Sequence, residues 1–90
     1  MITSVDLKFI IIDKQEDLPT LEVMQGRVGG NIECLTLANG DVIVCNETSR
    51  VEPTHYPVNI DASKLWSERT GNPTDTVLGH CYLVKSYIDF

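Results

Sequence analysis

Four polar residues near the middle of the chain are the best candidates for chemistry. Asn46 and Glu47 directly follow an apolar, β-rich run. Asn59 and Asp61 come one loop later, and if that loop folds back, both pairs would line one pocket. A few polar anchors on apolar walls are typical of a small-ligand site. With the nearby cationic and aromatic side chains at its rim, we expect a ligand- or partner-binding site formed by Asn46, Glu47, Arg50, Tyr56, Asn59, Asp61 and Trp66.

The same residues also have a purely structural interpretation. Asn46 and Glu47 would hold the following loop through side-chain to backbone hydrogen bonds. Asn59 or Asp61 would cap a helix. The two interpretations are compatible, because a capped loop can also bind a ligand.

The sequence contains no motif that indicates catalysis. His55 and His80 lack the helical spacing of paired metal ligands, and no third ligand is close in sequence. Ligands can converge from distant positions, but unconnected polar residues are the simpler interpretation. Gly29-Gly30 ends an expected helix and enters a strand, whereas a phosphate loop leaves a strand and begins a helix. We therefore expect a non-enzymatic protein without catalytic residues, metal or cofactor.

The three cysteines are an odd number and show no CxxC spacing. Both facts disfavour a disulfide scaffold and a zinc site. Cys34 and Cys45 lie in apolar runs, which favours inert core cysteines. Their expected opposition across a hairpin would allow a disulfide in principle, but we predict that they remain thiols in the cell.

The N-terminal third of the chain predicts a strand and then a helix. The β-branched run Leu7–Ile12 predicts a strand that is buried on both faces and central in a sheet. Residues Asp17–Val28 predict a helix with Pro19 in its first turn, because apolar side chains recur at spacings of three and four. Gly29-Gly30 would supply its left-handed C-terminal cap.

A β-hairpin is the clearest element that the sequence predicts. Asn39-Gly40 lies between the apolar runs Ile32–Leu37 and Val42–Cys45 and favours a two-residue type I′ turn. That turn fixes the register. The expected pairs are Leu37 with Val42, Thr36 with Ile43, Leu35 with Val44, Cys34 with Cys45, Glu33 with Asn46, and Ile32 with Glu47. Both faces are largely apolar, so we expect both to be covered.

The C-terminal half predicts a short helix and a last strand. Asn59–Trp66 would be the helix, with Asn59 or Asp61 as its N-cap. Ser67–Thr76 would be a loop, and Val77–Tyr87 the strand, with a bulge at Gly79. The resulting fold is α+β with a mixed or antiparallel four-stranded sheet in one domain, residues 1–90. Its element order matches the ferredoxin-like order, although the second helix is short for that motif.

The composition of the 90 residues limits the possible partners. Thirteen acidic residues against seven basic ones give a formal net charge of −6, and the basic residues are scattered. Sequence-independent binding to nucleic acid needs a basic face, so we do not expect it. The longest apolar run, Phe9–Ile12, is too short to cross a membrane. The N-terminus lacks the features of a signal peptide, so we expect a cytoplasmic location.

Several short motifs resemble the DUF3846 family. They are Val28–Glu33, Ala38–Gly40, the Cys-Asn-Glu that ends at Glu47, Pro57–Ala62 and Asp75–Gly79. The chain departs from the family by a longer stretch between Glu47 and Asn59 and by an extension past Val84. The family occurs in bacteria, plasmids and bacteriophages, and its function is unknown. The resemblance places the family's polar positions on Asn46, Glu47 and Asn59, which favours the pocket.

A binding module is the function that these features favour. A phage or mobile-element origin, which the resemblance implies, would make it an accessory protein in the host cytoplasm. It would bind a host protein or sequester a small nucleotide-like ligand. One alternative is a small enzyme for a nucleotide or peptide, with Glu47 or Asp61 as base and His80 or His55 nearby. Another is a structural homo-oligomer, such as a homodimer joined through an edge strand.

Overall fold

The chain forms strands and helices in the order expected from the sequence. A computed structural model describes residues 8–48 and 56–90. Its elements are β1 (Phe9–Ile12), the 3-10 turn η1 (Gln15–Asp17), α1 (Leu21–Val28), β2 (Ile32–Thr36), β3 (Val42–Asn46), α2 (Ile60–Thr70) and β4 (Cys81–Val84). The fold class is α+β, as predicted.

The four strands form one mixed sheet in the order β1-β4-β3-β2. β1 pairs in parallel with β4, and the other neighbours are antiparallel. The elements follow the ferredoxin-like order along the chain, but the sheet does not have the ferredoxin-like arrangement. The reason is that β3 and β4, which α2 connects, are antiparallel neighbours. β1 lies at an edge, so the prediction of a central strand was wrong. An apolar run marks a buried strand but not its place in the sheet, and the strand buried throughout is β4.

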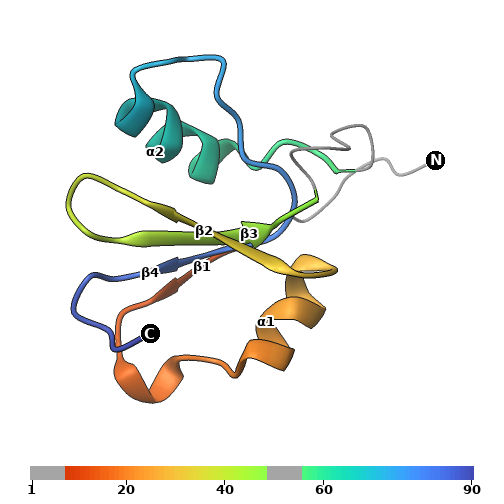
Figure 1. Cartoon of the computed structure of the whole chain (residues 1–90), viewed down its shortest axis with the longest axis vertical. Coiled ribbons are helices and arrows are strands. Elements are labelled where there is room, and N and C mark those ends of the chain that lie inside the picture. Colours follow the sequence, from red (N-terminus) through yellow and green to blue (C-terminus); the bar gives the residue numbers. More distant parts are fainter. Residues whose placement is uncertain (1–7, 49–55) are drawn as a thin grey trace.

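One helix covers each face of the sheet (Figure 1). Alternate side chains of β3 divide between the faces, because successive residues of a strand point to opposite sides. Ile43 and Cys45 face α2, whereas Val44 faces α1. The prediction that both faces are covered is confirmed. The α2-side cluster of buried residues is Leu35, Leu37, Ile43, Cys45, Ala62, Val77, Cys81 and Leu83. The α1-side cluster is Ile12, Met24, Val44, Tyr82, Val84 and Ile88.

Helix α1 begins later than predicted. Its N-cap is Thr20, whose Oγ1 accepts a hydrogen bond from the Val23 N–H at 3.3 Å. Pro19 therefore precedes the helix instead of occupying its first turn, because the capping threonine needs extended backbone. The predicted glycine cap is confirmed, since Gly29 has a φ of 87°.

Helix α2 is longer than predicted: it ends at Thr70, and its C-cap is Gly71, which has a φ of 75°. The expected end at Trp66 was wrong because Ser67–Thr70 is polar and carries no apolar periodicity. Asn59 is the N-cap, one of the two candidates expected. The last strand is also shorter than predicted, since β4 begins only at Cys81 after Gly79, which has a φ of 79°.

The β2–β3 hairpin forms, but its register differs by one residue from the prediction. The Leu37 N–H donates to the Asp41 carbonyl at 2.8 Å, so the loop has three residues and its left-handed position is Gly40. This is the turn with a glycine bulge rather than the two-residue type I′ turn. The observed pairs are Thr36 with Val42, Leu35 with Ile43, Cys34 with Val44, Glu33 with Cys45, and Ile32 with Asn46.

The shifted register separates two cysteines that the sequence placed opposite each other. Cys34 is exposed, whereas Cys45 is buried with Cys81 in the α2-side cluster. A disulfide between Cys34 and Cys45 therefore has no support from the strand pairing. All three cysteines are free thiols in the structure. That Cys34 and Cys45 remain thiols in the cell stays a prediction.

Candidate functional site

Asn46, at the end of β3, is buried and joins three segments of the chain. Its Nδ2 donates to the Val28 carbonyl at 3.0 Å and to the Tyr56 hydroxyl at 3.3 Å. Its Oδ1 accepts from the backbone N–H and the hydroxyl of Thr48, both at 2.7 Å. A buried amide needs such partners, since an unsatisfied polar group is costly. The side chain therefore ties the end of α1 to the end of β3.

Asn59 is the second buried amide, and it does more than cap α2. Its Oδ1 accepts from the Ala62 N–H at 3.2 Å, the usual role of an N-cap. Its Nδ2 donates to the Lys8 carbonyl at 3.1 Å and to the Gly79 carbonyl at 2.8 Å. One side chain thus fixes the beginning of α2 against the segments that lead into β1 and β4.

Tyr56 brings these two asparagines to the same end of the sheet. Its hydroxyl accepts from Asn46, and its ring lies close to Gly79, where an added Cβ would be 3.4 Å from Cδ1. The Gly79 carbonyl in turn accepts from Asn59. Asn46, Tyr56 and Asn59 therefore lie at one end of the sheet, but the two amides are only 1% and 3% exposed and hold protein groups, as in the structural interpretation of these residues.

Of the other predicted site residues, those that the structure describes do not join this network. Glu47 and Asp61 are exposed at the surface. Trp66 is half-buried against the α2-side cluster, and its indole N–H is buried without a partner in the described ranges. Arg50 lies outside the described residues.

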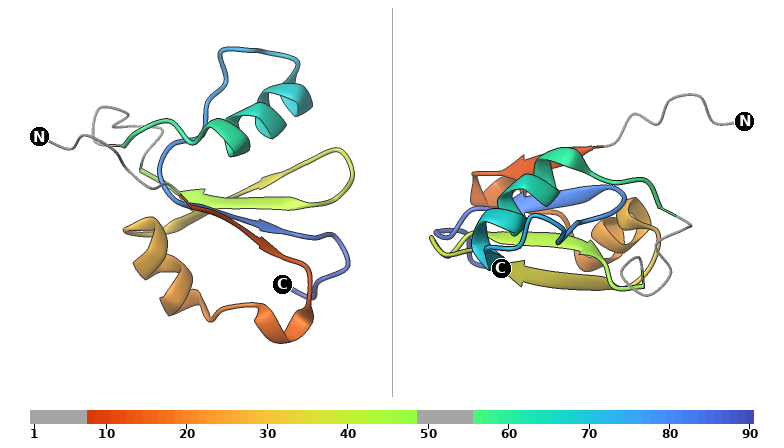
Figure 2. Two further views of the ribbon diagram at one scale, coloured as in Figure 1. Left: turned by 180° about the vertical axis from the view of Figure 1, so that it is seen from behind. Right: turned by 90° about the horizontal axis from the view of Figure 1, so that it is seen from above.

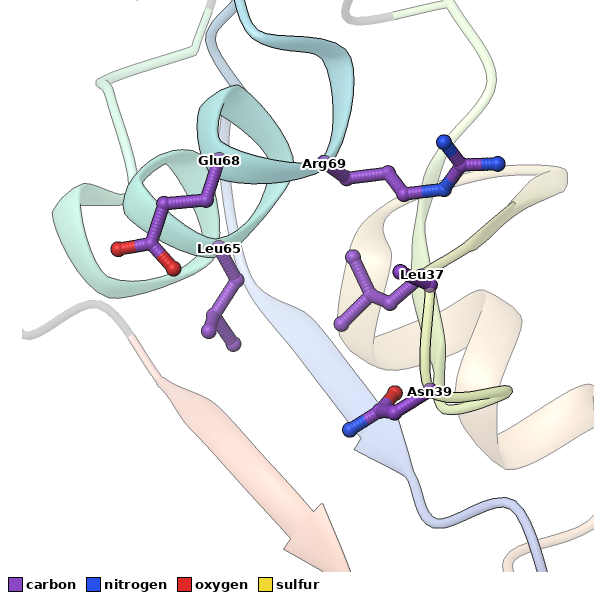
Figure 3. A pocket seen from close by; sticks show the side chains of 6 residues that line it. Leu37, Asn39, Leu65, Glu68 and Arg69 are labelled. Carbon is purple, nitrogen blue, oxygen red and sulfur yellow. The ribbon is translucent and has the colours of Figure 1, made fainter.

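A groove between α2 and the tip of the β2–β3 hairpin is a site that the sequence did not indicate. It has a volume of about 240 Å³ and is lined by Leu37, Ala38, Asn39, Leu65, Glu68 and Arg69. Figure 3 shows Leu65 pointing down from the helix toward the sheet, and Leu37 pointing from the hairpin toward Leu65. Arg69 extends from the helix over the hairpin, whereas Glu68 points away from it. We call this site the α2–hairpin groove.

A buried carboxylate holds the hairpin side of the groove in place. Asp41 accepts from the Ser86 N–H at 2.8 Å, from the Lys85 ammonium at 3.0 Å and from the Asn39 amide at 3.1 Å. The Asn39 Oδ1 accepts from the Asp41 N–H in return. The tip is therefore anchored to the segment after β4, and one wall of the groove is fixed before any ligand binds.

The same contacts change the protonation of Asp41. Burial by itself would raise the pKa of this carboxyl group, but the hydrogen bonds from Lys85, Ser86 and Asn39 and the Lys85 charge outweigh it. The pKa of Asp41 is therefore lower than usual. The bond to Asp41 likewise raises the pKa of Lys85, so the pair stays charged over an extended pH range.

The groove escaped prediction for two physical reasons. Glu68 and Arg69 lie past the predicted end of α2, so the helix face that carries them was assigned to a loop. Asn39 was assigned to a two-residue turn, which leaves no role for Asp41. Two signals in the sequence could have indicated these features. No Gly or Pro interrupts the chain between Asn59 and Gly71, and the charged Asp41 directly follows the turn.

The possible metal ligands of residues 8–48 and 56–90 do not gather in one place. No group of three His, Cys, Asp or Glu in these ranges could hold a metal ion. The His80 Nδ1 accepts the Lys8 N–H at 3.0 Å. Burial, with a contribution from Cys45, raises the pKa of Cys81 to about 12, so this thiol is a poor nucleophile. No helix in the same ranges is long and apolar enough to cross a membrane.

The sequence comparison decides the family. A domain of unknown function, DUF3846, matches residues 7–89, which is nearly the whole chain. The chain belongs to the DUF3846 family. Comparison with curated proteins and with solved structures found no match. In this DUF3846 protein, two of the polar positions that its motifs highlight, Asn46 and Asn59, are internal cross-links at one end of the sheet.

Proposed function

We propose that this DUF3846 protein is a non-enzymatic binding module whose ligand lies in the α2–hairpin groove. The observation that carries the proposal is the pairing of an apolar floor, Leu37 and Leu65, with the Arg69 guanidinium at the rim. Concave apolar surface with a few placed polar groups is the usual character of a binding site. Because the hairpin wall is anchored through Asp41, less ordering is needed when a ligand binds.

The chemistry of the groove favours a segment of a partner protein with an apolar side chain beside a carboxylate. The apolar side chain would lie between Leu37 and Leu65. The carboxylate would accept the paired N–H groups of Arg69, a geometry that guanidinium groups favour. The Asn39 Nδ2, which carries a second N–H besides the one given to Asp41, offers a further donor.

A nucleotide-like ligand fits the same groove less well. About 240 Å³ is below the roughly 300–1,000 Å³ of most small-molecule pockets. Arg69 is the one cation among the lining residues, and the chain carries a net charge of −6. Both features weaken binding of a polyphosphate. The family's occurrence in phages and plasmids extends the proposal to a host protein as the partner.

Titration followed by amide NMR shifts of the ¹⁵N-labelled protein tests this proposal. The probes are acetyl-Leu-Asp-amide, its neutral match acetyl-Leu-Asn-amide, and AMP. We expect the acidic peptide to shift the amides of Leu37, Asn39 and Leu65, with a Kd on the order of 1 mM. The neutral peptide should bind roughly tenfold more weakly because it lacks the charge-assisted bond.

Two variants separate the roles of the groove residues. Arg69→Gln should abolish the preference for the acidic peptide while leaving the weak binding of the neutral one. Arg27→Gln, at an exposed position of α1, is the matched control and should leave both affinities unchanged. Shifts confined to residues outside the groove would overturn the site. Shifts in the groove with AMP alone would replace the peptide with a nucleotide-like ligand.

A further inference from the structure

The two inner strands of the sheet bring two cysteines side by side. β3 and β4 are antiparallel neighbours, and Val44 lies opposite Tyr82. The next step along this register brings Cys45 opposite Cys81. Directly opposite side chains leave an antiparallel sheet on the same face. Both cysteines are 0% exposed and belong to the α2-side cluster, on the face that α2 covers (Figure 1).

The main-chain hydrogen bonds show which type of strand pair the two cysteines form. The Cys81 N–H donates to the Lys8 carbonyl at 3.0 Å, on the β1 side of β4. The main-chain groups of Cys81 therefore point away from β3, and Cys45 and Cys81 form a non-hydrogen-bonded pair. The Cα atoms of such a pair are about 4.5 Å apart. This separation lies within the roughly 4.4–6.8 Å that a disulfide spans, so the strands need not slip or separate for the two sulfur atoms to bond.

The surroundings of the two thiols are consistent with such a bond. Burial raises the pKa of Cys81 to about 12, and the neighbouring Cys45 contributes to this shift, so the two sulfur atoms are close enough to interact. The Cys45 thiol donates to the Glu33 carbonyl at 3.7 Å, and the Cys81 thiol to the Gly79 carbonyl at 3.4 Å. Because an S–H group is a weak donor, the loss of these two bonds on oxidation costs little.

The third cysteine lies on the other face of the sheet. Cys34 is opposite Val44, which belongs to the α1-side cluster, so its side chain projects away from Cys45 and Cys81. Cys34 is also exposed, whereas the other two are buried. The sheet thus separates Cys34 from the buried pair, and Cys34 is an internal control for a reaction between the other two.

We propose that Cys45 and Cys81 form a redox-sensitive pair that hydrogen peroxide converts to a disulfide between β3 and β4. The Cys45 sulfur attacks one peroxide oxygen and the O–O bond breaks. The leaving hydroxide takes the thiol proton and becomes water, which leaves a sulfenic acid on Cys45. The Cys81 sulfur then attacks the Cys45 sulfur, the S–O bond breaks, and the hydroxyl group leaves with the Cys81 proton as a second water. The two electrons lost by the sulfurs reduce the peroxide.

The order of these steps follows from the two thiols. The attacking group in the first step is a thiolate, and the high pKa of Cys81 makes it the worse candidate. Cys81 therefore acts second, on a sulfur that is already oxidised. In a reducing compartment both residues stay thiols, so the bridge would form only when peroxide is present. This inference does not depend on the proposed function.

The bridge should stabilise the fold, because it joins positions that are far apart in sequence. Cys45 and Cys81 enclose the whole of α2. A cross-link that closes a long loop restricts the unfolded chain more than the folded one. The bridged protein should therefore melt about 10 °C or more above the reduced protein.

Mass spectrometry of Cys34→Ser protein that is oxidised while folded tests the pair. An equimolar amount of hydrogen peroxide is added without denaturant, and any remaining thiols are alkylated after unfolding. We expect a species that is lighter by two hydrogen atoms and takes up no alkylating reagent. Trypsin should then release the peptide ending at Arg50 joined to the peptide ending at Lys85. Thermal melts before and after a reductant is added measure the gain in Tm.

Two further proteins serve as controls. Wild type should form the same bridge, with Cys34 outside it. Cys45→Ala in the Cys34→Ser background should gain no Tm on oxidation, and circular dichroism checks that it folds. If both buried cysteines are alkylated after peroxide treatment, or if either becomes a sulfinic acid without a bridge, the inference is overturned. A wild-type bridge from Cys34 to a buried cysteine would contradict the assigned faces and overturn it as well.

Discussion

At the scale of single residues, the two buried asparagines show how far a sequence pattern reaches. The N-cap role of Asn59 was predictable, because it depends on the Ala62 N–H three residues later. Its donor role was not, since Lys8 and Gly79 are 51 and 20 residues away in sequence. Asn46 is similar, with a partner carbonyl 18 residues upstream. Local capping can be read from spacing, but long-range cross-links need the fold.

Asn59→Asp distinguishes the cap from the cross-link. Aspartate is as good an N-cap as asparagine, so a mere cap would tolerate the change. Here the second carboxylate oxygen would face the Lys8 and Gly79 carbonyls with no proton to donate. We expect a loss of about 2–3 kcal/mol in the free energy of unfolding, measured by urea denaturation at neutral pH. Stability equal to wild type would refute the cross-linking role.

Asp41 is the residue that sequence reasoning missed, and its lowered pKa predicts a pH dependence. A carboxyl group with a lower pKa in the folded state stabilises the protein above its unfolded pKa, near 4. That stabilisation is lost as the pH falls through the folded pKa. At neutral pH, Asp41→Asn should lower the Tm by on the order of 5 °C.

Thermal melts of Asp41→Asn and wild type at several pH values measure this effect. The difference in Tm should be constant from pH 6 to 7 and should shrink as the pH falls below about 4. Asp75→Asn, in the loop after α2, is a control that keeps the net charge matched. A difference that persists unchanged in acid would show that the Asp41 charge does not hold the hairpin tip.

At the scale of elements, the hairpin shows why local turn chemistry can mislead. Asn39-Gly40 correctly predicted a hairpin, but the turn type depended on a partner outside it. Asp41 is bound by Lys85 and Ser86, and a longer loop lets it reach them. The helices were predicted only in part. The Gly29 C-cap of α1 and the Asn59 N-cap of α2 were predicted, whereas the Thr20 N-cap of α1 and the Gly71 C-cap of α2 were missed.

Two glycines with opposite expected effects test the observed turn. Gly40 has a φ of 90°, and an added Cβ would lie 3.1 Å from the Ser86 Cβ. Gly40→Ala should therefore cost about 1–2 kcal/mol in unfolding free energy. Gly26, inside α1, has nothing within 4 Å of an added Cβ, so Gly26→Ala should add about 0.5–1 kcal/mol. Urea denaturation of both variants measures the signs, and a neutral Gly40→Ala would contradict the left-handed turn.

At the scale of the whole molecule, the order of elements was predictable and the order of strands was not. Hydrophobic periodicity identifies each strand and helix on its own. Which strands become neighbours depends on the crossovers, and here β4 enters between β1 and β3. The strand that appeared central in sequence is therefore an edge. The groove, too, exists only because a full-length α2 reaches the hairpin tip.

The sheet order separates the α2–hairpin groove from β1 and predicts that changes on β1 leave the groove unaffected. β1 and β2 form opposite edges, and the α2–hairpin groove lies at the tip of the β2–β3 hairpin, away from β1 (Figure 2). Changes at distant sites without shared partners are usually additive. Ile11→Lys should therefore leave the Kd for acetyl-Leu-Asp-amide within about twofold of wild type. The amide NMR titration measures this Kd, and a larger change would show that the groove is coupled to β1.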